Sequence, residues 1–208
     1  MNQRQTNKAN RQRLIVKNAA RLFSSTGYNQ TTIEMVAERS NVSPVTIYNN
    51  FENKTGLLLA VLIEEGAGAK GLGERIIDQR EHGDAEVLYR LIEVYVDHPM
   101  EFMNKSCWRQ SLAAATASES KKFTEEYQNV DKTLCKQLIT VVCSLYEEGV
   151  FKAQVDAHTL GEVLWNNINQ MFTDYISDDG MTLGALKSAL RRQTEALLLL
   201  AMRPRSRC

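Results

Sequence analysis

Residues 31–54 place the tightest constraint on the fold, because the segment TTIEMVAERSNVSPVTIYNNFENK combines two helix-start signals with one turn signal. Thr31 and Glu34 fit a capping box, in which each side chain binds a backbone amide at the helix start. Asn41 tolerates the left-handed backbone conformation that follows a helix. Residues 43–44, Ser-Pro, are an N-cap followed by proline at the first helical position. The pattern predicts a helix-turn-helix, whose second helix can lie in the major groove of DNA.

Charge is unevenly distributed along the chain, although the formal net charge of the whole is zero. Residues 1–54 hold eight Lys and Arg against three acidic residues, a net charge of +5, and the remaining residues hold 17 against 22, a net charge of −5. This asymmetry is typical of a small DNA-binding head on a more acidic body. We therefore predict a DNA-binding domain over 1–54 and a helical effector-binding and dimerisation domain over 55–208.

Apolar periodicity and the small number of prolines predict an all-α protein of about nine helices. Three form the DNA-binding head, and a fourth begins near Asn53 and runs into Gly66, Gly68, Gly71 and Gly73. Because glycine weakens helices, this run predicts a loosened junction between head and body. The helices with predicted limits cover about residues 10–26, 84–98 (ended by Pro99), 100–117, 119–148, 156–176 and 182–202.

Several classes of protein are disfavoured by what the sequence contains. The N-terminus MNQRQTNKANRQR has no apolar core and no run of about 18 apolar residues occurs, which predicts neither a signal peptide nor a membrane span. The cysteines lack CxxC pairing and fit reduced thiols of a cytoplasmic protein; they are Cys107, Cys135, Cys143 and Cys208. No metal or cofactor is expected.

An all-helical enzyme is the main alternative class. The three histidines, His82, His98 and His158, supply no Glu-x-x-His pair, and neither a G-x-S-x-G elbow nor a Walker loop occurs. Cys107 next to Trp108 could be a nucleophile, although a buried structural thiol is the more common role. We therefore predict that the protein is not an enzyme.

Two apolar stripes follow helical spacing in the last two predicted helices, and they suit either a four-helix bundle with a second copy or this chain's own core. The spacing alone does not separate these alternatives. The stripes consist of Leu160, Leu164, Ile168, Met171 and Tyr175, and of Leu183, Leu186, Leu190, Leu197 and Leu200.

The helix-turn-helix region, about residues 10–60, resembles the N-terminal signature of the TetR family of transcriptional regulators. The residues that carry the resemblance are Phe23, Gly27, Tyr28, Thr31, Thr32, Ile33, Ala37, Val42, Ser43, Thr46, Ile47, Tyr48, Phe51 and Lys54. Ser40, Asn41 and Asn50 depart from the residues frequent in the family. The resemblance implies a homodimer formed by the last two helices, a pseudo-palindromic DNA operator and a small-molecule effector that releases a repressor. An architectural DNA-binding protein without an effector is the alternative.

The resemblance also implies sites. Phosphates would be held by Thr32, Tyr48 and Lys54, and base edges would be contacted by Pro44, Val45, Thr46 and Asn49, with Asn50 suited to either role. The effector pocket would lie among the middle helices, where each candidate side chain also has an ordinary structural role as the alternative. Its candidates are Tyr89, Glu93, Trp108, Arg109, Gln110, Trp165, Asn166 and Asn169.

Overall fold

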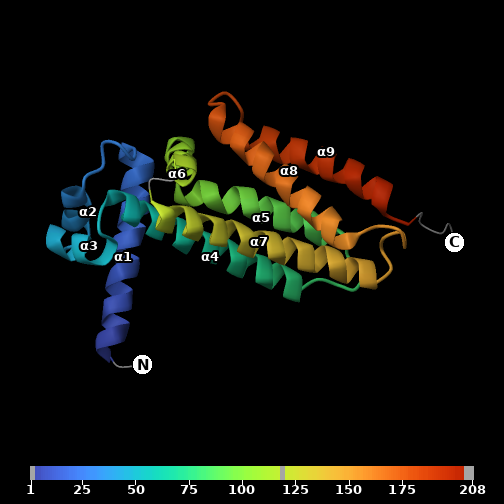
Figure 1. The fold of residues 1–208 in the computed structure, drawn as a ribbon, viewed down its shortest axis with the longest axis horizontal. Coiled ribbons are helices and arrows are strands. Elements are labelled where there is room, and N and C mark those ends of the chain that lie inside the picture. The colour runs from blue at the N-terminus through green and yellow to red at the C-terminus, as the bar shows by residue number, and fades with distance from the viewer. Residues whose placement is uncertain (1–2, 118–119, 204–208) are drawn as a thin grey trace. The chain divides into compact units, whose positions relative to one another are not determined.

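The computed structural model describes residues 3–117 and 120–203, and within these ranges it contains nine α-helices and one isolated β-bridge, Phe151–Met202 (Figure 1). The predicted all-α class and helix number are confirmed. The helices are α1 (Gln3–Thr26), α2 (Ile33–Arg39), α3 (Pro44–Phe51), α4 (Lys54–Asp78), α5 (Glu86–Phe102), α6 (Lys105–Ala117), α7 (Lys121–Glu147), α8 (Ala157–Ser177) and α9 (Leu183–Ala201). Cys208 lies outside the described residues.

The chain divides into two compact units, residues 1–67 with 99–130 and residues 68–98 with 131–208. These units are defined by the contacts within the structure. The domain limit predicted at residue 54 instead separates a DNA-binding head from an effector-binding body, and it stays a prediction. The boundary at 67/68 falls inside the glycine run of α4.

In the first unit, α1, α2 and α3 pack around a small apolar core (Figure 1). Ile15 and Phe23 of α1, Val36 of α2 and Ile47 of α3 are fully buried. Burial of such side chains contributes about 1.5–3 kcal/mol each, which offsets the low intrinsic stability of helices as short as α2 and α3.

The start of α2 differs from the predicted capping box. Thr32, not Thr31, is the N-cap, and its hydroxyl accepts a hydrogen bond from the Met35 amide at 3.2 Å. Thr31 is fully buried and donates instead to the carbonyl of Gly27 at 2.8 Å. The hydroxyl of Thr31 therefore stabilises the end of α1, because the turn after that helix directs it inward.

The remaining signals of the helix-turn-helix are confirmed. Asn41 has φ of 52°, the left-handed conformation predicted for the turn. Ser43 caps α3, accepting from the Thr46 amide at 3.3 Å, and Pro44 occupies the first helical position.

Three helix limits were predicted wrongly. α6 begins at Lys105 and not at about residue 100, because α5 extends to Phe102. α1 begins at Gln3 and not near residue 10, since residues 3–9 contain no proline or glycine to oppose a helix. α5 continues through Pro99 to Phe102, although proline lacks an amide hydrogen and crowds the carbonyl four residues earlier. The turn beyond Pro99 is closed by the Met103 amide, which donates to the Pro99 carbonyl at 3.1 Å. The carbonyl of Pro99 accepts from the indole nitrogen of Trp108 at 3.0 Å.

A loosened junction at the glycine run of α4 stays a prediction. The glycines do not interrupt the helix. They are contact points instead. A Cβ on Gly66 would lie 2.3 Å from Val130 in the first unit, and a Cβ on Gly73 would lie 2.5 Å from Gln137 in the second. Glycine therefore lets α4 and α7 approach closely.

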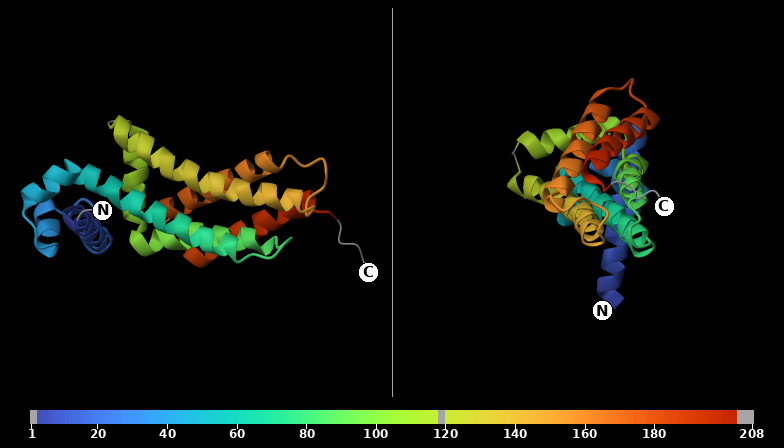
Figure 2. Two further views of the ribbon diagram at one scale, coloured as in Figure 1. Left: turned by 90° about the horizontal axis from the view of Figure 1, so that it is seen from below. Right: turned by 90° about the vertical axis from the view of Figure 1, so that its right-hand side faces the viewer.

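In the second unit, α8 and α9 lie side by side, as Figures 1 and 2 show. Asp156 and Thr182 cap these helices by accepting from Thr159 and Ala185 amides. Gly161 of α8 fits tightly against Ile139 of α7.

We expect Gly161→Ala to destabilise the protein by about 1–3 kcal/mol through overpacking. The added Cβ would lie 3.0 Å from the backbone Cα of Ile139, which a side-chain rotation cannot relieve. Gly184→Ala on α9 is the control, since its Cβ would meet nothing closer than 3.9 Å, and it should stabilise by about 0.5–1 kcal/mol. Urea unfolding of both variants checks this, and equal shifts would contradict the packing argument.

Candidate DNA-binding surface and ligand grooves

α3, the second helix of the helix-turn-helix and the candidate recognition helix for DNA, has one buried and one exposed face. Ile47 is fully buried, whereas 64% of Val45 and 46% of Tyr48 are exposed, and Asn49 is exposed as well. A half-buried Pro44 begins the helix. An exposed valine and tyrosine on a short capped helix form a surface that is available to base edges and phosphates.

Thr32 and Thr46 extend this surface. Thr32 is exposed, and because its oxygen accepts from an amide, its hydroxyl hydrogen is left to donate. The Thr46 hydroxyl lies 3.0 Å from the Ser43 hydroxyl, so the cap of α3 also orients Thr46.

Asn50 is engaged within the protein. Its amide nitrogen donates to the Thr46 carbonyl at 2.6 Å, and its amide oxygen accepts from the side chain of Gln12 at 2.9 Å. Asn50 therefore joins α1 to α3, a positioning role that the sequence did not indicate. Gln12 was missed because no local signal connects it to a residue so distant in the chain.

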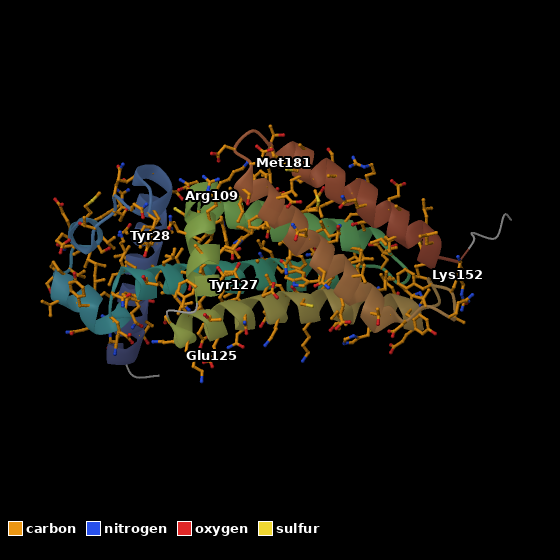
Figure 3. The ribbon with its side chains drawn as sticks, turned by 45° about the horizontal axis from the view of Figure 1, so that its top comes forward. Tyr28, Arg109, Glu125, Tyr127, Lys152 and Met181 are labelled. Carbon is orange, nitrogen blue, oxygen red and sulfur yellow. The ribbon has the colours of Figure 1, made fainter. Side chains whose placement is uncertain are left out.

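Lys54 is also engaged, at the start of α4. Its ammonium donates to the carbonyls of Tyr28, Asn29 and Thr31 at 3.0, 3.3 and 3.1 Å. The same nitrogen lies 4.5 Å from the centre of the Tyr28 ring, which Figure 3 labels. Lys54 thus fixes the turn between α1 and α2, and this turn presents Thr32.

Glu52 ends the recognition helix in a strained backbone conformation. Its φ of 67° is positive without glycine, and its amide donates to the Tyr48 carbonyl at 2.8 Å. A non-glycine residue in such a region costs about 1–3 kcal/mol and persists only where its surroundings hold it.

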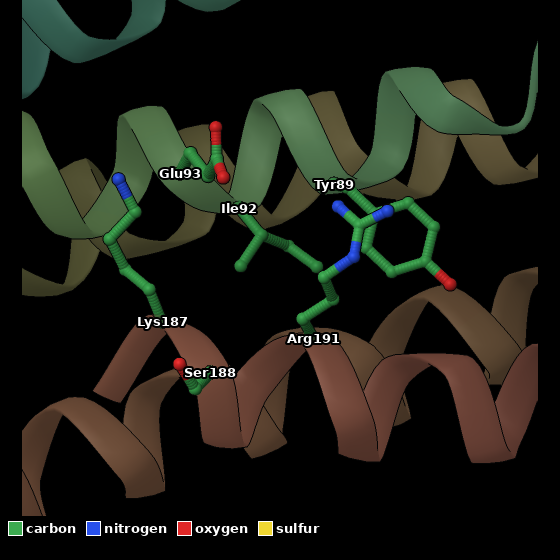
Figure 4. Close-up of a pocket in the computed structure, with 6 residues that line it drawn as sticks. All are labelled: Tyr89, Ile92, Glu93, Lys187, Ser188 and Arg191. Carbon is green, nitrogen blue, oxygen red and sulfur yellow. The ribbon is translucent and has the colours of Figure 1, made fainter. Parts of the chain in front are cut away.

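Two predicted ligand residues, Tyr89 and Glu93 of α5, line one groove of about 150 Å³ with Lys187 and Arg191 of α9 (Figure 4). The Arg191 guanidinium lies 4.4 Å from the centre of the Tyr89 ring. Burial is the main cause that raises the pKa of Tyr89. Lys187, whose pKa is raised by its hydrogen bond to Asp97, sits 2.8 Å from that carboxylate. The groove offers an aromatic platform, two cations and one carboxylate.

Trp165 and Asn169 of α8 meet at a carboxylate that the sequence did not indicate. Both donate to Asp131 of α7, at 3.1 and 2.8 Å. Tyr95 packs edge-on against Trp165 at 5.4 Å and donates to Gln137, while burial raises the pKa of Tyr95 above its ordinary range.

The other predicted ligand residues lie elsewhere. Trp108, Arg109 and Gln110 belong to α6 in the first unit, where Trp108 is buried and the other two are half-buried (Figure 3 labels Arg109). Asn166 is exposed on α8. Cys107 is fully buried and donates to the Phe23 carbonyl, and burial raises the pKa of its thiol, as the prediction of a structural thiol requires.

Most residues of the two apolar stripes predicted for dimerisation are buried or half-buried within this chain. Its buried members are Leu164, Ile168, Tyr175, Leu186 and Leu190, and its half-buried members are Leu160, Met171, Leu183 and Leu197. Leu200 is 75% exposed, next to Leu199 at 70%. On α8 the exposed apolar residue is Val163 at 43%. The sequence did not single out Val163 and Leu199 as exposed apolar residues, because helical spacing does not show which face of a helix is turned inward.

Within the described ranges, no helix combines the length and apolar character that crossing a bilayer requires.

Comparison with known proteins connects this geometry to a family. Residues 15–61 match the family described as "Bacterial regulatory proteins, tetR family". The uncharacterized HTH-type transcriptional regulator YvkB of Bacillus subtilis (strain 168) is 38% identical over 61 residues, 29% of this chain and 32% of YvkB. The matched segment therefore spans about a third of that relative.

Solved structures extend the likeness to the whole fold. A putative TetR-family regulator from Mesorhizobium loti has a TM-score of 0.72 at 18% identity, with 94% of this chain and 98% of that chain covered. A putative transcriptional regulator from Saccharomonospora viridis in complex with choline has a TM-score of 0.75 at 21% identity, with 94% and 100% covered. FadR from Bacillus subtilis in complex with stearoyl-CoA has a TM-score of 0.67 at 16% identity, with 89% and 96% covered. The helix-turn-helix region of this chain thus matches the TetR family of bacterial regulatory proteins, and the chain as a whole has the fold of solved TetR-family regulators.

Proposed function

We propose that this protein is a ligand-responsive transcriptional repressor that binds a pseudo-palindromic operator as a homodimer in the cytoplasm. The observation that carries the proposal is the division of α3 into a buried face and an exposed face that presents Val45, Tyr48 and Asn49. In a dimer two such helices would enter successive major grooves, roughly 34 Å apart.

The DNA contacts divide by chemistry. Thr32 and Tyr48 would donate hydroxyl hydrogens to phosphates, which positions the head without reading sequence. Asn49 would pair with adenine, and Val45 or Thr46 would contact a thymine methyl group, with Pro44 beside them. Asn50 and Lys54 are bound to other parts of the protein, so we assign them positioning roles.

Two substitutions separate these roles. We expect Tyr48→Phe to weaken binding evenly across DNA sequences, because only a phosphate contact is lost. Asn49→Ala should instead relax preference at one base-pair position, by about 1–3 kcal/mol. Titration of both variants against the operator, its single-base variants and random DNA provides the measurement. Equal losses on specific and random DNA for both variants would contradict the assignment.

The effector is proposed to act by population shift. A ligand that favours a dimer with another spacing of its recognition helices weakens operator binding by its differential affinity for the two states. Choline and stearoyl-CoA, bound by two proteins of this fold, support the expectation of a small-molecule ligand. The proposed contacts are Tyr89 and Glu93, which lie beside Lys187 and Arg191. Trp165 and Asn169, which both donate to Asp131, are proposed as well.

Dimerisation is proposed to use the outward faces of α8 and α9. Leu199→Asp should shift the protein from dimer to monomer in sedimentation velocity, because a carboxylate would replace an apolar side chain that is 70% exposed in one chain. Leu14→Asp on α1, where 49% of the leucine is exposed, is the control and should leave the dimer intact. Unchanged sedimentation of the Leu199 variant would place the interface elsewhere.

Selection of bound fragments from a random DNA pool tests the proposed function as a whole. Recovery of a pseudo-palindrome with half-sites about one helical turn apart would establish a sequence-specific dimer. Recovery of no shared sequence, with binding that falls steeply with salt, would favour the architectural alternative.

A further inference from the structure

A second groove lies in the first unit, where α3 ends and where α4 and α7 begin, and it has a volume of about 270 Å³. We call it the α3–α7 groove. It is separate from the residues proposed for the effector, and none of the DNA-reading side chains Val45, Thr46 and Asn49 lines it. Its lining includes Phe51, Glu52, Leu59, Ile63, Lys122 and Phe123.

The floor of the groove is apolar. Phe123 and Leu59 are buried, whereas 40% of Ile63, which also lines the groove, is exposed. An occupant that covered Ile63 would remove this apolar surface from water, which is the main source of affinity in small-molecule sites.

The mouth of the groove carries an ion pair. The ammonium of Lys122 lies 3.2 Å from a carboxylate oxygen of Glu52, and 70% and 74% of the two side chains are exposed. Exposed pairs of this kind contribute little, so another anion can compete for Lys122. The helices α4 and α7, of 25 and 27 residues, both begin here, and their positive ends favour an anion over a cation.

We propose that the α3–α7 groove binds an amphipathic monoanion, such as a small aryl carboxylate, with its apolar body on Ile63 and Phe123 and its carboxylate on Lys122. The ligand would replace Glu52 as the partner of Lys122. Because Phe51 and Glu52, at the end of α3, line the groove, a ligand held there contacts the end of the recognition helix and would change its orientation. Ligand binding in the groove does not depend on the proposed function. The effect of that ligand on operator binding does rest on the proposed function.

The binding test uses 4-phenylbutanoate and its neutral analogue 4-phenylbutan-1-ol, followed by the methyl NMR signal of Ile63. The acid is expected to shift this signal and to bind about fivefold more tightly than the alcohol through the charge-assisted contact. Lys122→Gln should abolish the preference for the acid. Lys121→Gln, which removes a neighbouring ammonium that does not line the groove, should retain it. No shift of the Ile63 signal, or equal effects of the two variants, would overturn the proposal.

A second measurement addresses regulation. Saturating 4-phenylbutanoate is expected to lower operator affinity at least about threefold for the native protein, a modest coupling for an allosteric ligand, and not for Lys122→Gln. Binding at Ile63 without any change in operator affinity would overturn the regulatory part. Since the NMR readout needs no DNA, a protein that selects no operator would leave the binding result intact and refute only the proposed function.

Discussion

Replacing Lys54 by methionine is expected to destabilise the protein by about 3 kcal/mol and to weaken binding to operator and random DNA alike, about tenfold. The ammonium donates to three backbone carbonyls, and methionine can donate to none of them. The turn between α1 and α2 would loosen, and with it the position of Thr32 at the start of α2.

The salt dependence of binding separates this positioning role from a phosphate contact. Loss of one phosphate contact lowers the slope of log affinity against log salt by about 0.9. We expect the slope to stay unchanged in Lys54→Met, because the lost contacts are internal to the protein. Lys17→Met, an exposed lysine on α1, is the control for stability. A slope reduced by about one unit, with unfolding free energy unchanged, would return Lys54 to the phosphate-binding set.

The second large effect concerns Glu148, near the end of α7. Its carboxylate accepts from Arg80 at 3.0 Å, from the Gly83 amide at 2.6 Å and from Ser144 at 3.0 Å. The hydrogen bonds from Arg80, then that from Gly83, lower the pKa of Glu148 from 4.5 to about 2. About a tenth of each side chain in this ion pair is exposed, so the pair is shielded from solvent far better than an ordinary surface pair.

Glu148→Gln is expected to lower the free energy of unfolding by about 2 kcal/mol at neutral pH, the usual contribution of a hydrogen-bonded charge. Because the folded-state pKa is depressed, this contribution is present above pH 4.5 and is lost as the pH falls from 4.5 to about 2. The variant should therefore lose less stability than the native protein across that window. Urea unfolding between pH 2 and 7 measures it.

Glu147→Gln is the matched control, since Glu147 is exposed and adjacent. It should leave both the stability at neutral pH and the acid dependence close to those of the native protein. If the two variants respond alike, the cluster of Arg80, Gly83 and Ser144 around Glu148 does not stabilise the fold in the way the distances indicate.

The fold followed from local signals wherever a single segment decides the outcome. The Ser43 cap, the left-handed Asn41 and the number of helices needed only local spacing and chemistry. Thr31 was assigned the cap that Thr32 makes, because two neighbouring threonines differ only in how the preceding turn directs them. The prediction that Pro99 ends its helix is wrong, because contacts made after the proline, such as the Met103 amide on the Pro99 carbonyl, are not visible in the local sequence.

The candidate sites were less predictable, because each combines residues from helices that are distant in sequence. Tyr89 and Glu93 were identified, but their partners Lys187 and Arg191 follow about a hundred residues later, and only packing brings α5 beside α9. Asp131 was missed for the same reason. Periodicity identified apolar faces on α8 and α9 without distinguishing Leu164, which is buried, from Val163, which is 43% exposed.

The two faces of α3 also bear on how such a protein could change its target during evolution. Ile47 and Asn50 maintain the packing against the rest of the head, whereas Val45 and Asn49 contribute little to it. Substitutions at the second pair can therefore accumulate without the loss of stability that removes most mutations from a population. If the proposed function holds, a duplicated copy of this gene could acquire a new operator by changing a few exposed side chains, while inheriting its folding and the proposed ligand response.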